Sequence, residues 1–324
     1  MTSRAPVVAM LLVAAVAVTA MPVAADERFA LIVSGVSGGD KFAENYKKWV
    51  AQLDTALRGK LGVPGDHIVI LTENGTGPTA ATREGVAGAL AALQKRVTAG
   101  DTLLIVLIGH GTADSAAAKF NLVGPDWDTK EWKQALAPIA GRVIFVDTTS
   151  SSFPFVQDLS AKNRIVIAAT DSPAQKYDTI FPQFFIEALD KVAASDSDKN
   201  GRLSVWEAFV YASQAVKQSF DQKGTLVTER AVIDDNGDGV GKEATATTGA
   251  DGVLSKTTFL DAEPAATASN PAAAGLEKQR IALEAQIEEL KGRKDQMTPA
   301  DYDAQLEKLA VELAKISAQL RSTK

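Results

Sequence analysis

The sequence predicts an α/β protein with a mostly parallel sheet flanked by helices. Short apolar runs alternate with amphipathic helical patterns from about residue 29 to residue 240. The apolar runs are nearly continuous in Val, Ile and Leu, which is typical of strands buried on both faces. The predicted strands are residues 29–34, 67–71, 102–108, 142–146 and 164–169.

Helical patterns separate and follow these strands. In the first, Tyr46, Trp49, Val50, Leu53 and Leu57 form one apolar stripe at helical spacing. The predicted helices are residues 42–61, 82–97, 130–136, 182–194 and 205–220.

The overall composition is that of a soluble globular protein. Hydrophobic residues make up 46% of the 324 residues and charged residues 23%. The net charge is −6 and there is no long basic run, so we expect no nucleic-acid partner, which would require a concentrated positive patch.

The N-terminus has the order of a secretory signal peptide. Arg4 precedes an apolar run over residues 6–20, and small residues at 23–25 precede Asp26. We therefore expect cleavage of residues 1–25 and export to the periplasm or the extracellular space. The alternative is an uncleaved membrane anchor, because residues 6–25 could just span a bilayer.

Two further segments follow the α/β domain, which we place at residues 26–243. Residues 244–275 are rich in Ala, Thr, Gly and Pro without a clear period, which predicts a linker. Residues 276–322 carry apolar seams, with Thr298 as a helix N-cap and Pro299 at the first helical position. The second seam has heptad spacing and consists of Tyr302, Leu306, Leu309, Leu313, Ile316 and Leu320. These residues predict a helical hairpin or, through self-association, a longer coiled coil, and the α/β domain could then serve as a scaffold for assembly.

Six short segments occur in the order found in one peptidase clan. They are ALIVSG at the first strand, ATRE, GDTLLIVLIGHG, RVIFVDTTSSS, RIVIAAT and FPQFFIEAL. On these segments, residues 29–241 resemble the caspase-like clan, most closely bacterial proteins similar to its legumain branch. The resemblance implies a caspase-like fold.

The resemblance also implies a catalytic His–Cys dyad at the ends of the third and fourth strands. His110, between Gly109 and Gly111, matches the histidine, whereas the cysteine position falls on Thr149. The chain contains no cysteine, so we expect a non-catalytic pseudopeptidase that binds peptide or protein. The alternative is an active hydrolase in which His110 activates Thr149 or one of Ser150, Ser151 and Ser152, although the sequence does not reveal a carboxylate to orient the histidine.

Residues 196–207 match the twelve-residue calcium loop of an EF-hand at every diagnostic position. Helical patterns flank this loop on both sides, and Leu203 at position 8 is the apolar residue that normally packs against a partner loop. The predicted ligands are Asp196, Asp198, Asn200, the Arg202 carbonyl, Ser204 and Glu207. The sequence therefore predicts a bound Ca²⁺.

A second acidic cluster begins in the same way but ends differently. Asp234, Asn236 and Asp238 match positions 1, 3 and 5, whereas Thr245 stands where the closing glutamate belongs. The cluster is either a partial calcium site or a glycine-rich turn. We expect no segment of the chain to pair with the first loop.

Overall fold

The computed structural model describes residues 26–114, 117–246, 251–262 and 270–322. The predicted signal peptide lies outside the described residues. Within the described part of the chain, no helix is long and apolar enough to cross a membrane.

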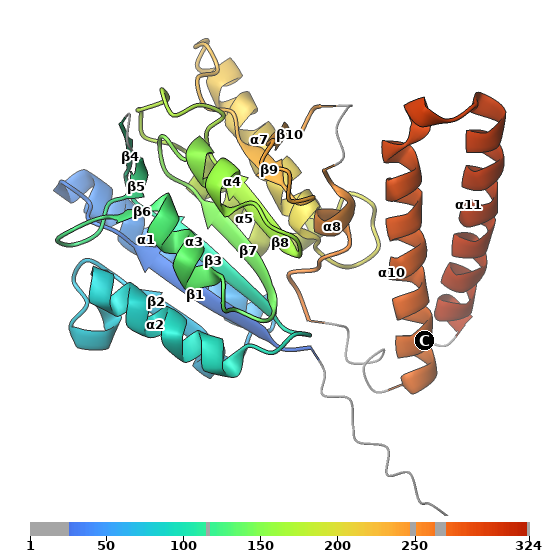
Figure 1. The fold of residues 1–324 in the computed structure, drawn as a ribbon, viewed down its shortest axis with the longest axis horizontal. Helices are drawn as coiled ribbons and strands as arrows, with labels where there is room; N and C mark the ends of the chain where they lie inside the picture. The colour runs from blue at the N-terminus through green and yellow to red at the C-terminus, as the bar shows by residue number, and fades with distance from the viewer. Residues whose placement is uncertain (1–25, 115–116, 247–250, 263–269, 323–324) are drawn as a thin grey trace, which may run out of the picture.

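A seven-stranded sheet forms the centre of the α/β domain (Figure 1). Its strand order is β10-β9-β8-β7-β3-β1-β2. Five strands are parallel: β1 (Arg28–Ser34), β2 (Ile68–Leu71), β3 (Thr102–Ile108), β7 (Arg142–Asp147) and β8 (Arg164–Ala168). Two short antiparallel strands, β9 (Val232–Asp234) and β10 (Lys242–Glu243), complete one edge. The predicted mostly parallel sheet is confirmed.

Helices cover both faces of this sheet, because alternate residues of each central strand face opposite sides. In β1, Ala30 and Ile32 belong to the core cluster on one face, and Leu31 and Val33 belong to the cluster on the other. The first cluster is covered by α1 (Asp40–Gly59), α5 (Phe181–Asp190) and α7 (Val205–Gln222). The second is covered by α2 (Arg83–Arg96), α3 (Thr129–Leu136) and α4 (Phe153–Leu159).

The structure differs from the predicted elements in several places, and the edge strands β9 and β10 are among the elements that were not predicted. The helix expected over residues 182–194 ends at Asp190, and Lys191 (φ −101°, ψ 50°) separates it from the short helix α6 (Val192–Ser195). Helix α4 was not predicted. A small antiparallel sheet beyond β3 was not predicted either; it contains β4 (Gly111–Ala113), β5 (Ala118–Phe120) and β6 (Trp127–Asp128).

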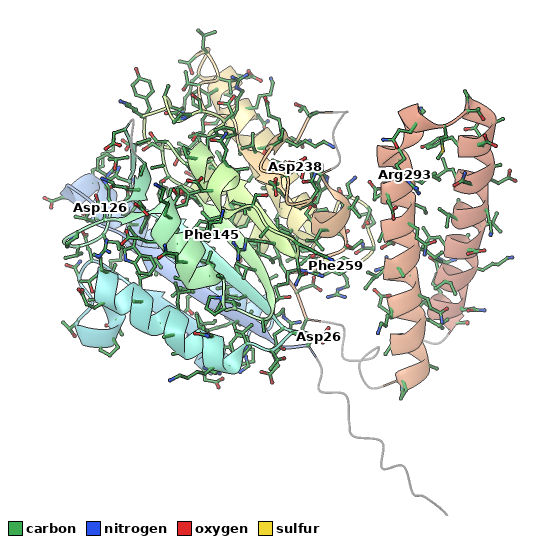
Figure 2. The ribbon with its side chains drawn as sticks, viewed as in Figure 1. Asp26, Asp126, Phe145, Asp238, Phe259 and Arg293 are labelled. Atoms are coloured by element: carbon green, nitrogen blue, oxygen red, sulfur yellow. The ribbon has the colours of Figure 1, made fainter. Side chains whose placement is uncertain are left out.

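Part of the segment predicted as a linker belongs to the folded domain. Residues 251–261, which we call the strap, contain helix α8 (Val253–Lys256) and then run beside residues 202–205. The Leu260 N–H donates to the Leu203 carbonyl (2.8 Å) and the Val205 N–H donates to the Thr258 carbonyl (2.9 Å). Figure 2 shows Phe259 of the strap on the side of the domain that faces the C-terminal helices. The low-complexity composition concealed these tertiary contacts.

The C-terminal segment forms two helices that lie side by side (Figure 1). They are α10 (Pro271–Gly292) and α11 (Pro299–Ser322), joined by a short turn. Thr298 caps α11 as expected, because its hydroxyl accepts a hydrogen bond from the Asp301 N–H (3.2 Å). Of the seam residues on α11, Tyr302 and Leu320 are buried and the four between them are only partly buried.

We predict that Leu260→Ala destabilises the α/β domain by about 2–4 kcal/mol, because Leu260 is buried in the core cluster against α1, α5 and α7. Urea unfolding measures the change. Leu226→Ala is the control, since that side chain is 87% exposed and its loss should leave stability unchanged. Equal stability of both variants would show that the strap is a passive linker.

Candidate functional site

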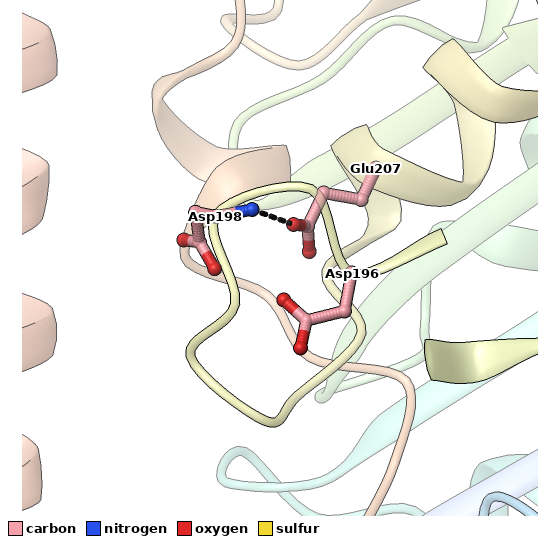
Figure 3. Close-up of side chains that lie close together, drawn as sticks. All are labelled: Asp196, Asp198 and Glu207. Carbon is pink, nitrogen blue, oxygen red and sulfur yellow. Dashed lines mark hydrogen bonds between the residues drawn. The ribbon is translucent and has the colours of Figure 1, made fainter. Parts of the chain in front are cut away.

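Residues 196–207 (loop 1) run from the end of α6 into the first turn of α7 and bring three carboxylates together. Oxygen atoms of Asp196, Asp198 and Glu207 lie within 4.8 Å of one another (Figure 3). Asp196 and Glu207 are buried, whereas Asp198 is exposed. The structure therefore assembles the charged ligands predicted at positions 1, 3 and 12.

Hydrogen bonds from the loop backbone hold this arrangement. The Gly201 N–H donates to Asp196 Oδ2 (3.0 Å), the Asn200 N–H to Asp198 Oδ1 (2.9 Å), and the Arg202 N–H to Asn200 Oδ1 (2.8 Å). Gly201 has a φ of 83°, a left-handed conformation that a glycine adopts without strain. The turn that aims these side chains inward therefore depends on the glycine at position 6.

Glu207 closes the loop and also starts helix α7. Its Oε1 accepts hydrogen bonds from the N–H groups of Ser197 (2.8 Å) and Asp198 (3.3 Å). Its Oε2 accepts from the Ser204 N–H (3.0 Å) and hydroxyl (2.8 Å), and the Glu207 N–H donates back to Ser204, which completes a capping box.

The electrostatics of loop 1 suit a hard cation. Although Asp198 as a whole is exposed, partial burial of its carboxylate raises its pKa, and the nearby charges of Glu207 and Asp196 raise it further. Carboxylates, an amide oxygen and a backbone carbonyl are the oxygen ligands that Ca²⁺ prefers, so the residues present fit this ion.

Loop 1 is paired, contrary to the expectation from the sequence. Ser204 and the strap residue Phe259 form an antiparallel β-bridge, next to Leu203 at position 8. Two residues from the bridge on each segment, Arg202 Nε lies 3.1 Å from Asp261 Oδ2 in a buried ion pair. The pairing segment escaped prediction because it is not itself a calcium loop.

The second acidic cluster, residues 234–245 or loop 2, repeats the hydrogen bonds of loop 1. The Gly239 N–H donates to Asp234 Oδ2 (2.6 Å), the Asp238 N–H to Asn236 Oδ1 (2.8 Å), and the Val240 N–H to Asp238 Oδ1 (2.7 Å). These contacts join the same loop positions as the three backbone bonds of loop 1.

The strap residue Asp251 takes the place of the missing closing glutamate. Its Oδ1 accepts hydrogen bonds from the N–H groups of Asp235 (2.9 Å) and Asn236 (3.3 Å), which are positions 2 and 3. Glu207 accepts from the same two positions in loop 1. Burial raises the pKa of Asp251 to about 6, and the charges of Asp235, Asp234 and Asp238 add to this rise.

The two loops differ in how far their carboxylates converge. Among the described residues, only Asp196, Asp198 and Glu207 form a trio with oxygens within 4.8 Å of one another. Asp251 was missed because it lies in the segment predicted as a linker; the Asp251-Gly252 pair is its only local signal.

His110 lies just beyond the carboxyl end of β3, as the resemblance implied. Its Nε2 is 2.9 Å from the Ser37 carbonyl oxygen, and its Nδ1 is 3.2 Å from Asp178 Oδ1. The edges of the Phe42 and Tyr46 rings pack around it at centroid distances of 4.9 and 5.8 Å. Asp178 is a carboxylate in contact with His110 that the sequence did not reveal.

The structure brings the Thr149 segment against the backbone next to His110. A Cβ atom on Gly111 would lie 2.4 Å from Thr149 Oγ1, so only glycine fits there. The approach does not pair a hydroxyl with the imidazole, however. Among the described residues, the hydroxyls of Thr149, Ser150 and Ser151 donate to the carbonyls of Ser150, Gly111 and Gln175, and that of Ser152 bonds to Thr170.

Asp147, at the end of β7, is fully buried beneath these hydroxyls. Its Oδ1 accepts a hydrogen bond from the Thr149 N–H (3.0 Å), and its Oδ2 has no partner among the described residues. Burial raises its pKa from 3.8 to about 7, although its hydrogen bonds to Thr149 oppose the rise.

Comparison with solved structures gives distant likenesses. No family model and no curated protein matches the sequence. A Geobacter sulfurreducens protein of known structure is 13% identical, with a TM-score of 0.42 over 64% of this chain and 92% of that one. A secreted C11 cysteine protease from Bacteroides thetaiotaomicron is 12% identical, with a TM-score of 0.40 over 65% of this chain and 66% of that one. At this similarity neither structure assigns a family or an activity to the chain.

We predict that Asp147→Asn reduces the loss of stability between pH 5 and pH 8 by on the order of 2 kcal/mol. The pKa of Asp147 is higher in the folded state, so its contribution is complete below about pH 4 and is lost as the pH rises through about 7. Asparagine does not ionise, so this loss disappears. Urea unfolding at several pH values tests this, with Asp303→Asn on the exposed face of α11 as the control. Parallel pH profiles of wild type and Asp147→Asn would contradict the prediction.

Proposed function

We propose that this chain is an exported, non-catalytic calcium-binding protein that binds a peptide or protein. The observation that supports it best is the convergence of Asp196, Asp198 and Glu207 in a loop with an EF-hand pattern of ligands and turns. Loop 2, closed by Asp251, is a second proposed calcium site. The proposed export rests on the N-terminal sequence pattern.

The carboxyl edge of the sheet supports a binding role better than a catalytic one. A cysteine nucleophile is absent from the sequence, and the hydroxyls at 149–152 are buried and donate to other acceptors. A general base needs a free ring nitrogen directed at the nucleophile, but both nitrogens of His110 face other oxygen atoms. We therefore propose a pseudopeptidase of the caspase-like clan.

The C-terminal helices are the proposed assembly element. The partly buried apolar residues between Tyr302 and Leu320 leave α11 with a surface that a second copy could cover. A nucleic-acid partner is not proposed, since the net charge is −6.

A second candidate function is hydrolysis with Thr149 or a neighbouring serine as nucleophile. The contact between His110 and Asp178 favours it, because hydroxyl nucleophiles are activated by a histidine that a carboxylate orients. This function would require the hydroxyls to leave their present acceptors.

We predict that calcium raises the melting temperature of the protein and that a chelator reverses the rise. A ligand that binds only the folded state stabilises by about 2.7 kcal/mol at a hundredfold excess over Kd. Glu207→Gln should remove most of the shift, because it loses one charge while an amide oxygen remains to cap α7. Asp221→Asn, on the exposed C-terminal turn of α7, is the matched control and should keep the full shift.

Calorimetric titration of the wild type and of Asp251→Asn with calcium distinguishes the two loops. The wild type should bind about two ions, and Asp251→Asn should lose the loop 2 site while loop 1 remains. A melting curve of the wild type that calcium does not move would refute the calcium proposal.

We predict that the purified protein does not hydrolyse a broad peptide library, since the nucleophile of the clan is missing. Fluorogenic peptides provide the measurement, with His110→Ala and Thr149→Ala as paired variants. Hydrolysis lost in both variants would establish the hydrolase instead. Hydrolysis lost only in His110→Ala would point to one of the serines.

A further inference from the structure

Loop 1 faces helix α10 across a cleft of about 800 Å³. Asp198 and Glu207 line its domain side, and Glu277, Arg280 and Glu284 line its α10 side. In Figure 3 Asp198 lies on the side of the loop that is nearest to the turns of α10.

The strap fixes α10 in this position. Lys256 of the strap forms an ion pair with Glu288 of α10. Lys256 also lies over the ring of Trp206, 5.1 Å from its centroid, and Trp206 is position 11 of loop 1. Lys256 therefore links Glu288 of α10 to the Trp206 ring of loop 1.

A buried cation on α10 lines the same cleft as the loop carboxylates Asp198 and Glu207. Arg280 has only 9% of its side chain exposed, and its guanidinium pairs with Glu277 and Glu284 at 2.6 Å each. Burial lowers the pKa of Arg280, but the Glu277 hydrogen bond and the charges of Glu284, Glu277 and Asp198 together raise it. Burial raises the pKa of Glu284, Arg280 opposes this rise and the charge of Asp198 adds to it. The same carboxylate therefore favours the charged form of Arg280 and disfavours that of Glu284.

When no metal is bound, the charges of Arg280 and Glu284 on α10 act in opposite directions on the carboxylates of loop 1. Three converging carboxylates repel one another, and a nearby guanidinium offsets part of that repulsion. A calcium ion performs the same neutralisation more completely, because it carries two charges and binds the oxygens directly. Arg280 and calcium therefore compete for the negative charge of the loop, whereas Glu284 attracts calcium.

We propose that Arg280 is a built-in counter-ion of the calcium-free loop, presented by α10, and that the opposing charges of Arg280 and Glu284 set the calcium affinity of loop 1. This inference rests on the proposed calcium binding at loop 1. Helix α10 thereby regulates calcium binding at loop 1, in addition to the role in assembly proposed for the C-terminal helices.

Isothermal titration of full-length variants with calcium tests the inference. Arg280→Gln should bind calcium about three- to tenfold more tightly than the wild type, and Glu284→Gln should bind more weakly by a similar factor. Arg280→Lys keeps the charge and should stay near the wild-type affinity. Arg293→Gln is the matched control, because Arg293 is the C-cap residue of the same helix and its half-exposed side chain pairs with Glu289 at the surface (Figure 2).

Melting curves in chelator provide a second measurement. Arg280→Gln should melt below Arg293→Gln without calcium, and this gap should shrink with calcium, because the ion then replaces the lost counter-ion. If the wild type binds calcium but Arg280→Gln and Arg293→Gln share its affinity, the inference is wrong and the proposed function stands. If the wild type binds no calcium at loop 1, the proposed function itself fails.

Discussion

The carboxylate of Glu207 is the interaction on which much of the molecule depends. One of its oxygens holds the first residues of loop 1, and the other caps α7 through Ser204. Ser204 lies in turn in the β-bridge to the strap. A single side chain therefore fixes the closure of the loop, the start of a core helix and the edge on which residues 258–261 pack. Such a residue couples any ion in the loop to the stability of the domain.

The strap extends this coupling to both acidic loops and to the C-terminal helices. Asp251 at one end closes loop 2, and Asp261 at the other holds Arg202 of loop 1. Between them, Lys256 connects Trp206 to Glu288 on α10. The strap therefore contacts both acidic loops and α10 within residues 251–261.

The polar groups at the carboxyl edge of the sheet, where the resemblance implied a catalytic site, have structural partners. The hydroxyls at residues 149–152 are buried and bonded, which satisfies groups that would otherwise be costly inside a protein. Asp147 beneath them is largely protonated below its raised pKa of about 7. The contact between His110 and Asp178 lies closer to the surface, with about half of the Asp178 side chain exposed.

The sequence by itself determined the parallel strands, most of the helices and the spacing of the carboxylates in loop 1, because each of these has a local signature. Continuous apolar runs specify strands buried on both faces, and the spacing of Asp196, Asp198, Gly201 and Glu207 specifies the loop. Only the tertiary structure decided the surroundings of Asp178, Asp251 and Arg280, since each lies near groups that are distant in the sequence. The same reason applies to the strap. Its hydrogen bonds and the burial of Leu260 come from the surfaces against which it packs, so its own composition resembles that of a linker.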